Sequence, residues 1–124
     1  MLTSINPVIL FVKDYEKAFR FYKDTLGLKL VSAEEPHDEF ATFEIGGTVF
    51  ALHGGYDGEI REGNIALHFV SSDIRNEVRR LKKKGVNFRK QIRKMPWGAL
   101  QTTFVDPDGN EFDLIQHPKG GPIM

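Results

Sequence analysis

The chain has 124 residues, of which 40% are hydrophobic, and its 17 Lys and Arg residues balance 17 Asp and Glu residues. This length suits a single domain that buries a core without disulfides, and the balanced charge excludes a broad basic field, so we expect no nucleic-acid partner. Cysteine is absent, which excludes thiol catalysis and cysteine-based metal sites.

No targeting segment is expected. No apolar run approaches the ~20 residues needed to cross a bilayer, and the first residues lack the charged and apolar regions of a signal peptide. The sequence therefore predicts a cytoplasmic protein with no membrane partner. Two basic runs, 79–84 and 89–94, are interpreted as solvated faces of a helix and of a strand edge.

The first half of the chain predicts a strand, a helix and three more strands. Residues 7–12 form an apolar run rich in β-branched residues, which is typical of a strand. Asp14 can cap a helix that Gly27 ends. Strands are expected over 28–33, 40–45 and 48–53, the last two joined by a Gly46-Gly47 turn. The apolar stripe of the helix recurs at helical spacing and consists of Tyr15, Ala18, Phe19, Tyr22 and Leu26.

After a glycine-rich connection, 54–63, the same order of elements starts again. Residues 64–70 predict a strand, Ser72 or Asp73 can cap a helix, and Gly85 is expected to end it. The buried stripe of this helix is Ile74, Val78 and Leu81, and the strands that follow are expected over 86–93, 100–105 and 111–117. Gly27 and Gly85 are 58 residues apart, so the pattern indicates a tandem repeat of one β-α-β-β-β unit.

The repeat predicts an α+β fold made of two modules. One helix covers one face of each sheet and leaves the other face bare, so the modules are expected to pair into a curved sheet around a cleft. We predict a single domain, 1–124. Its expected parts are module one at 5–53, the linker at 54–63, module two at 64–117 and a C-terminal tail at 118–124.

The strand that follows the Asp106-Pro107-Asp108-Gly109 turn contains the first candidate for chemistry. Side chains alternate along a strand, so Glu111, Asp113 and Ile115 point to one face and Phe112 and Leu114 to the other. A carboxylate in the middle of a strand is costly unless it is paired or binds something. Asp113 is therefore a candidate functional residue, whereas Glu111 lies nearer the turn and is expected to be exposed.

The sequence resembles the vicinal oxygen chelate superfamily, which contains glyoxalase I, extradiol dioxygenases, methylmalonyl-CoA epimerase, and the fosfomycin and bleomycin resistance proteins. The residues that carry the resemblance are Val12-Lys13-Asp14, the segment 18–30, Gly46-Gly47 and the segment 106–110. The resemblance implies the glyoxalase/bleomycin resistance/dihydroxybiphenyl dioxygenase fold and a homodimer. These motifs are turns, caps and core residues, so they specify architecture rather than chemistry.

In metal-dependent members of that superfamily, the first and last strands of each module supply one metal ligand each. Transferred to this sequence, the four places fall at Pro7, at or beside Ala51, at Asn64 and at Asp113. Pro7 and Ala51 have no ligand atom in their side chains, and Asn64 has only a weak amide oxygen. The resemblance therefore predicts that the usual metal site is absent.

A shifted metal site is an alternative. His53 lies two residues beyond Ala51 and His68 four beyond Asn64, so each points to the same face as the vacated place. With Asp113 they make a two-histidine, one-carboxylate set that suits Zn, Ni, Mn, Fe or Co. The structural alternative is a water-facing His53 at a strand end and a His68 that is hydrogen-bonded in the core or cleft.

A metal-free pocket is the favoured interpretation. Trp97, the only tryptophan, lies in the Met95-Pro96-Trp97-Gly98 turn, which resembles a turn of the bleomycin resistance proteins, and its ring can stack on a planar ligand. An equal alternative is that Trp97 plugs the end of a strand. The expected apolar floor is Ile9, Phe11 and Ala66, and the expected polar groups are Asn64, His68, Gln101 and Asp113.

Three functions follow from these alternatives. The favoured one is a small-molecule-binding protein without the usual metal, which holds an apolar or planar ligand in the cleft between the modules. The second is a metal-dependent lyase, isomerase or dioxygenase that uses His53, His68 and Asp113. The third is a metal-free lyase or isomerase in which Asp113 or His68 acts as general base.

Overall fold

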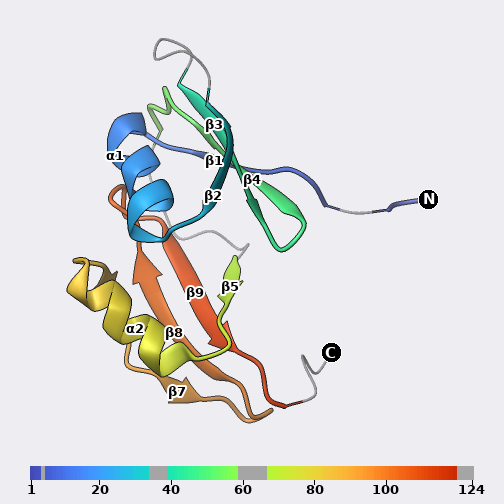
Figure 1. Cartoon of the computed structure of the whole chain (residues 1–124), viewed down its shortest axis with the longest axis vertical. Helices are drawn as coiled ribbons and strands as arrows, with labels where there is room; N and C mark the ends of the chain where they lie inside the picture. The colour runs from blue at the N-terminus through green and yellow to red at the C-terminus, as the bar shows by residue number, and fades with distance from the viewer. Residues whose placement is uncertain (4, 34–38, 59–66, 120–124) are drawn as a thin grey trace. The chain divides into compact units, whose positions relative to one another are not determined.

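The computed structural model describes residues 1–3, 5–33, 39–58 and 67–119. The chain divides into two compact units, Met1–Glu59 and Ile60–Met124, and each unit has one β-sheet with its own helical layer (Figure 1). The predicted α+β class is confirmed. In the described residues no helix is long and apolar enough to cross a membrane.

The first unit has a four-stranded sheet in the order β1-β4-β3-β2. β1 lies parallel to β4, with Val8 opposite Phe50, and the other two pairs are antiparallel. Gly46 and Gly47 have φ values of 56° and 84°, which suits the tight turn between β3 and β4. The elements are β1 (Val8–Phe11), α1 (Tyr15–Arg20), the π-helical turn η1 (Phe21–Thr25), β2 (Lys29–Ala33), β3 (Phe40–Ile45) and β4 (Thr48–His53).

The second unit repeats this plan. Its sheet runs in the order β5-β9-β8-β6, β7 also pairs with β8, and β5 lies parallel to β9. The predicted strand over 64–70 is described only from residue 67 onward, so its first part lies outside the described residues. The elements are β5 (His68–Val70), α2 (Ile74–Lys83), β6 (Asn87–Phe88), β7 (Arg93–Lys94), β8 (Leu100–Val105) and β9 (Glu111–Gln116).

The first helix begins where the sequence predicts but changes its winding before its end. The side chain of Asp14 accepts a hydrogen bond from the backbone N–H of Lys17 at 3.2 Å, which caps α1. After Arg20 the helix widens into η1, where the N–H of Leu26 donates to the carbonyl of Phe21 at 2.9 Å. Gly27, at φ 76°, then turns the chain toward β2, as expected.

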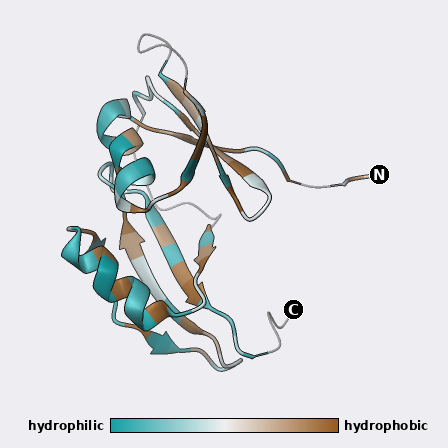
Figure 2. Ribbon diagram, viewed as in Figure 1, coloured by the Kyte–Doolittle hydropathy of each residue, from teal (hydrophilic) through white to brown (hydrophobic). Residues whose placement is uncertain are grey.

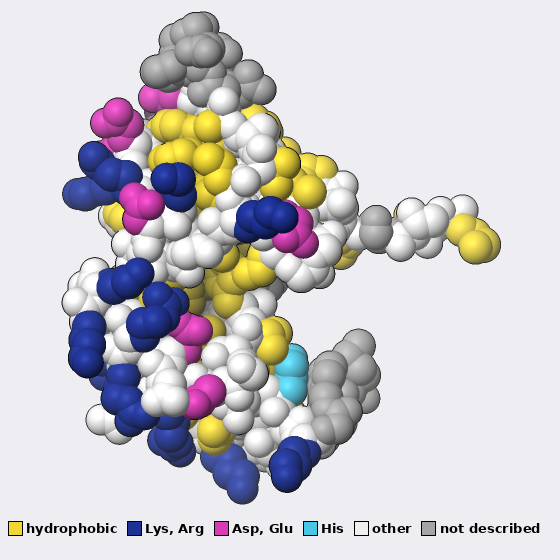
Figure 3. Space-filling model, in the orientation of Figure 1, with side chains coloured by type: hydrophobic (Ala, Val, Ile, Leu, Met, Phe, Trp, Pro, Cys, Tyr) yellow, Lys and Arg dark blue, Asp and Glu magenta, His cyan; other side chains and the backbone are white. Residues whose placement is uncertain are grey.

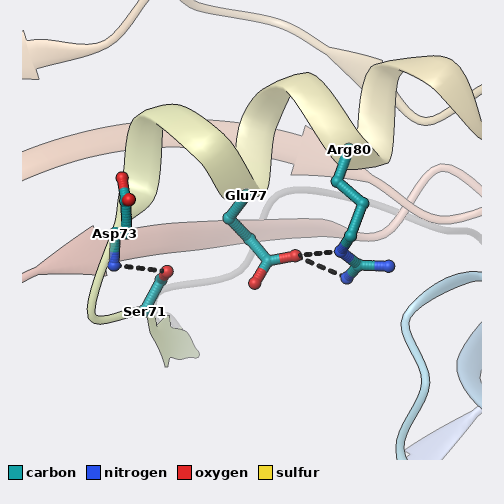
Figure 4. Close-up of polar contacts among 4 residues, drawn as sticks. All are labelled: Ser71, Asp73, Glu77 and Arg80. Carbon is teal, nitrogen blue, oxygen red and sulfur yellow. Dashed lines mark hydrogen bonds and ion pairs between the residues drawn. The ribbon is translucent and has the colours of Figure 1, made fainter.

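Asp73, rather than Ser72, caps α2. Its side chain accepts a hydrogen bond from the backbone N–H of Asn76 at 3.3 Å, and its own N–H donates to the hydroxyl of Ser71 at 3.1 Å (Figure 4). One turn further on, the guanidinium of Arg80 binds the carboxylate of Glu77. The start of α2 is therefore defined by hydrogen bonds from short polar side chains next to it in the sequence.

Each helix covers one face of its sheet with aromatic and aliphatic side chains. In the first unit the rings of Tyr22 and Phe50 lie 5.2 Å apart and those of Phe19 and Phe43 lie 6.0 Å apart. In the second unit the N–H of Ile74 donates to the side chain of Gln116, on the face of β9 that also carries Phe112 and Leu114. In Figure 2 hydrophobic residues recur along α2 between residues that are hydrophilic.

The strand predicted over 86–93 is wrong in its middle. The structure has two separate two-residue strands there, β6 and β7, which both pair with β8. Between them Arg89, Lys90 and Gln91 are exposed and Ile92 alone is apolar and half-buried, so this stretch lacks the alternation of a continuous strand. Its backbone is instead held by the hydroxyl of Thr102, which donates to the carbonyl of Lys90 at 2.6 Å.

The turn between β8 and β9 is built around a buried carboxylate. The side chain of Asp106 accepts hydrogen bonds from the backbone N–H of Asp108 at 3.0 Å and of Asn110 at 2.8 Å. Gly109 has φ 91°, a conformation that favours glycine. This turn sets the register that places Thr103 opposite Asp113.

Candidate functional site

The face of each sheet that lies opposite its helix is called here the open face. In the second unit, Phe104 and Phe112 point toward the helix side, so the alternating residues of β8 and β9 point to the open face. Glu111, Asp113 and Ile115 share that face, as predicted. His68 lies on it too, because β5 pairs His68 with Asp113.

Three side chains of the open face form what we call the polar trio: Thr103, Asp113 and His68. The hydroxyl of Thr103 donates to Oδ1 of Asp113 at 2.8 Å, and Nε2 of His68 lies 3.2 Å from Oδ2. The side chains of His68 and Asp113 are 39% and 22% exposed, so both can be reached from solvent.

Gln101 lies two residues before Thr103 on the same face of β8. Its side chain is buried, and its Oε1 has no hydrogen-bond partner among the described residues. A buried carbonyl oxygen without a donor costs about 1–3 kcal/mol. Gln101 was predicted to bind ligand, and its unpaired oxygen is compatible with a donor supplied from outside the chain.

The open face of the first unit is apolar along β1 and includes one histidine, His53, on the neighbouring strand β4. Ile9 and Phe11 are 44% and 49% exposed and lie opposite Ala51 and His53 across the β1–β4 pair. The ring of His53 lies 5.1 Å from that of Phe11 and 5.8 Å from that of Phe40, measured between centroids. Its Nδ1 lies 2.8 Å from the carbonyl oxygen of Gly54. His53 is therefore exposed at a strand end but held between two aromatic rings.

The usual metal places of the superfamily do not fit a metal in this chain. Pro7 precedes β1 and Ala51 is buried in β4, and neither side chain has an atom that can bind a cation. Both oxygens of Asp113 already have partners in Thr103 and His68. Asn64 lies outside the described residues.

The shifted metal site stays a prediction. His68 and Asp113 are in contact in the second unit, whereas His53 belongs to the first unit. Over the parts of the chain that the structure describes, no group of three or more His, Asp or Glu side chains is arranged to hold a metal ion.

Of two further predicted ligand residues, Trp97 and Ala66, the structure describes only Trp97. Trp97 is 43% exposed in the turn that follows β7, where the N–H of Gly98 donates to the carbonyl of Met95 at 2.9 Å. Ala66 lies outside the described residues. Trp97 is exposed, and its role in stacking on a ligand stays a prediction.

Thr103 is the residue that sequence reasoning missed. The predicted strand limits, 100–105 and 111–117, pair Val105 with Glu111 and hence Thr103 with Asp113. The partner of Asp113 was therefore readable from the sequence. The Gly46-Gly47 turn likewise pairs Ile45 with Thr48 and hence Phe40 with His53, so this contact was readable as well.

Comparisons with known proteins agree with this architecture. Residues 4–114 match the model of the Glyoxalase/Bleomycin resistance protein/Dioxygenase superfamily. A lactoylglutathione lyase of Neisseria meningitidis is 30% identical over 123 residues, which span 90% of this chain and 89% of that protein. The uncharacterised protein YraH of Bacillus subtilis is 31% identical over 126 residues, or 91% of this chain and 98% of that protein.

Solved structures show the same fold. A superfamily member from Sphaerobacter thermophilus has a TM-score of 0.78 and 33% identity, with 94% of this chain and 98% of that chain covered. The fosfomycin resistance protein FosX of Listeria monocytogenes has a TM-score of 0.79 at 20% identity, with 97% and 98% covered, which bears on the fold alone. The chain therefore belongs to the glyoxalase, bleomycin resistance protein and dioxygenase superfamily.

Proposed function

We propose that this chain is a small-molecule-binding protein of its superfamily that holds an apolar or planar ligand without a metal at the usual places. The observation that carries the proposal is the donor set. Pro7 and Ala51 offer no ligand atom, and Asp113 already binds Thr103 and His68 through both oxygens. The ligand is proposed to lie in the cleft that the superfamily resemblance predicts.

The residues of the two open faces support a mostly apolar ligand with a few polar groups. Ile9 and Phe11 leave large apolar surfaces exposed, and fully burying one such side chain contributes about 1.5–3 kcal/mol. His68 and Asp113 offer a donor and an acceptor that can orient a bound molecule. An apolar surface with few polar groups is typical of small-molecule sites.

Ligand binding can be tested with the planar dye 8-anilinonaphthalene-1-sulfonate, followed by dye fluorescence and by quenching of Trp97. We expect Phe11→Ala, His68→Ala and Trp97→Ala each to weaken binding at least several-fold. Ile5→Ala, which removes another exposed apolar side chain ahead of β1, is the matched control. Equal affinities of the Trp97 and His68 variants and the wild type would refute the proposed site.

Metal dependence needs its own measurement on protein purified without chelator or metal-affinity resin. We expect substoichiometric Zn, Ni, Mn, Fe and Co by elemental analysis and no thermal stabilisation when these ions are added. Near-stoichiometric metal that disappears in both His68→Ala and Asp113→Ala would instead support the metal-dependent enzyme with the His53, His68 and Asp113 set. Comparing dye affinity before and after dialysis against chelator shows whether ligand binding needs a metal.

The contact between His68 and Asp113 favours a second candidate function, a metal-free lyase or isomerase. A carboxylate that binds one ring nitrogen of histidine orients the ring so that the other nitrogen can accept a proton from a substrate. His68 suits the role of base better than Asp113, because Oδ1 of Asp113 accepts a hydrogen bond from Thr103 and its Oδ2 lies 3.2 Å from Nε2 of His68. The relationship to a lactoylglutathione lyase motivates a search for carbon–hydrogen acid substrates.

Catalysis by His68 predicts proton exchange that a binding protein does not produce. Under this second function the wild type exchanges the acidic carbon-bound proton of an α-hydroxy carbonyl compound in deuterium oxide, and His68→Gln loses the activity. An unchanged exchange rate in His68→Gln would exclude this role.

A homodimer is also proposed from the superfamily resemblance and is tested by light scattering of the purified protein.

A further inference from the structure

The balanced charge of the whole chain conceals a strongly basic segment in the second unit. Residues 74–94 contain ten Lys and Arg residues and a single acidic residue, Glu77. The rest of the chain holds seven basic and sixteen acidic residues. All ten cations are exposed, and we call them the basic band: Arg75, Arg79, Arg80, Lys82, Lys83, Lys84, Arg89, Lys90, Arg93 and Lys94.

Packing and hydrogen bonds attach both parts of the basic band to the same sheet. α2 buries Ile74, Val78 and Leu81, so its Lys and Arg side chains are left on the outward side. The second part is fixed to β8, because the N–H of Arg89 donates to the carbonyl of Thr103 at 2.8 Å and β7 pairs with Leu100 and Gln101. Figure 3 shows Lys and Arg side chains gathered along one side of the second unit.

The basic band has little internal neutralisation. Glu77 binds Arg80, and the guanidinium of Arg79 donates to the side-chain oxygen of Asn76. Nine more cations than acidic residues therefore lie within 21 residues. Like charges this close repel one another, and an anionic partner would relieve that repulsion. Solubility and protection of a sheet edge explain a few such charges, but they do not require a whole helix face as well.

The composition of the basic band favours a polyanion with repeated phosphates. No large hydrophobic residue within 74–94 is exposed among the described residues, so a membrane would gain no apolar insertion. The cations lie on the outside of a helix and along a sheet edge rather than converging, which disfavours a single small phosphate compound. Five of the ten are arginines, whose planar guanidinium binds phosphate through two hydrogen bonds.

We propose that the basic band docks the phosphodiester backbone of a nucleic acid, without base readout. This revises the sequence-based expectation of two solvated runs and no nucleic-acid partner, which rested on the charge of the whole chain. A straight α-helix of ten residues is about 15 Å long, so α2 and the β6–β7 edge together span several phosphates. Neutralising about five of them gives a log–log salt slope of about −4.5.

Binding is measured by fluorescence anisotropy with a labelled 30-base-pair DNA duplex and a labelled single-stranded RNA of 20 nucleotides. We expect binding of at least one of them at 50 mM NaCl, with an affinity loss by 200 mM NaCl of about 500-fold for the duplex or about 130-fold for the single strand, whose salt slope per phosphate is smaller. The two probes distinguish double-stranded from single-stranded partners. Vesicles containing phosphatidylserine are the third arm, and binding to vesicles without binding to either nucleic acid would overturn the proposal.

Charge-reversal variants separate the basic band from general electrostatics. The helix variant carries Arg75→Glu and Lys83→Glu, and the edge variant carries Lys90→Glu and Lys94→Glu. The matched control carries Lys17→Glu and Lys23→Glu, two exposed cations of the first unit. We expect at least 10-fold weaker binding in both band variants and less than 3-fold weakening in the control. Equal weakening in all three, or an effect in only one band variant, would refute a continuous docking surface.

Discussion

Tyr15 is expected to make the free energy of unfolding depend on pH in the alkaline range. Burial raises the pKa of its phenol above the ordinary value of 10.0, and the negative charge of Glu39 raises that pKa further. The unfolded chain loses this proton at a lower pH than the folded chain does. The contribution of Tyr15 is therefore fully present below pH ~10 and is lost as the pH rises through the folded pKa.

The change that tests this effect is Tyr15→Phe. Between about pH 9 and pH 11 we expect the wild type to lose more free energy of unfolding than the variant, because the variant has no phenol to titrate. Urea unfolding at the two pH values gives the comparison, and Tyr56→Phe serves as a matched control. Equal losses in the wild type and Tyr15→Phe would show that the phenol of Tyr15 is not the source.

Thr103 is expected to stabilise the polar trio through a single hydrogen bond. Thr103→Val keeps the shape of the side chain but leaves Oδ1 of Asp113 without its donor. We expect a loss of about 1–3 kcal/mol in the free energy of unfolding. Thr103→Ser retains the hydroxyl and should recover most of this loss in the same denaturation experiment. A Thr103→Val protein as stable as the wild type would contradict the assignment.

At this scale the sequence predicted which residues share a face better than it predicted their partners. Strand alternation placed Asp113 and His68 on one face, and the structure joins them at 3.2 Å. The third member, Thr103, lies on a strand that meets Asp113 only through the register of a turn. Alternation gives direction within one strand, whereas a contact between strands also needs the register.

Among the elements, α2 is expected to depend strongly on its first turn. The backbone N–H groups there have no helical partner, and Asp73 and Ser71 supply two of the hydrogen bonds (Figure 4). Asp73→Ala should reduce the free energy of unfolding by about 0.5–2 kcal/mol.

The matched variant for this position is Asp73→Asn, which keeps a side-chain oxygen. We expect Asp73→Asn to lie close to the wild type in urea unfolding, with Asp73→Ala clearly below both. Ser71→Ala removes the neighbouring hydroxyl and should have a smaller effect, because it accepts only from the N–H of Asp73. Equal stability of Asp73→Ala and Asp73→Asn would mean that the cap contributes nothing measurable.

Element boundaries were predictable where caps and turns define them. Strands β3, β4 and β8 have the predicted limits. The Gly46-Gly47 turn separates β3 from β4, and the turn from Asp106 to Gly109 follows β8. The π-helical turn after Arg20 and the break between β6 and β7 were missed. In both cases the local sequence is compatible with regular structure; at the break, the side-chain hydroxyl of Thr102 binds the carbonyl of Lys90, a contact that no local pattern predicts.

Over the whole molecule, hydrogen exchange should follow the position of each strand in its sheet. β4 and β3 are central in the first sheet and β9 and β8 in the second, so each has a hydrogen-bonded strand along both of its edges. We expect peptides covering 48–53 and 100–105 to exchange much more slowly than those covering 29–33 and 87–94. Mass spectrometry after deuterium labelling measures these rates. Slow exchange over 87–94 would contradict the short edge pairing of β6 and β7.

The repeated plan was predictable because the sequence signals of its two copies agree with each other. Gly27 and Gly85, the two helical stripes and the two sets of strands agree in order and spacing, and the structure gives each unit one sheet and one helical layer. The two basic runs were expected as solvated faces, but their combination into one basic band was not predicted. A balanced total hides a local excess, and the packing of α2 together with the edge pairing of β6 and β7 leaves all ten cations exposed.

The parallel pairing of first and last strands also has a consequence for protein synthesis. Val8 pairs with Phe50 and His68 with Asp113, so each sheet needs residues more than 40 positions apart before its first strand finds its partner. At about 5–20 residues per second, the ribosome adds that length in roughly two to eight seconds. β1 and β5 are therefore exposed as nascent, unpaired strands during translation, and Lys13 and Asp14 place charges directly beyond the apolar run of β1.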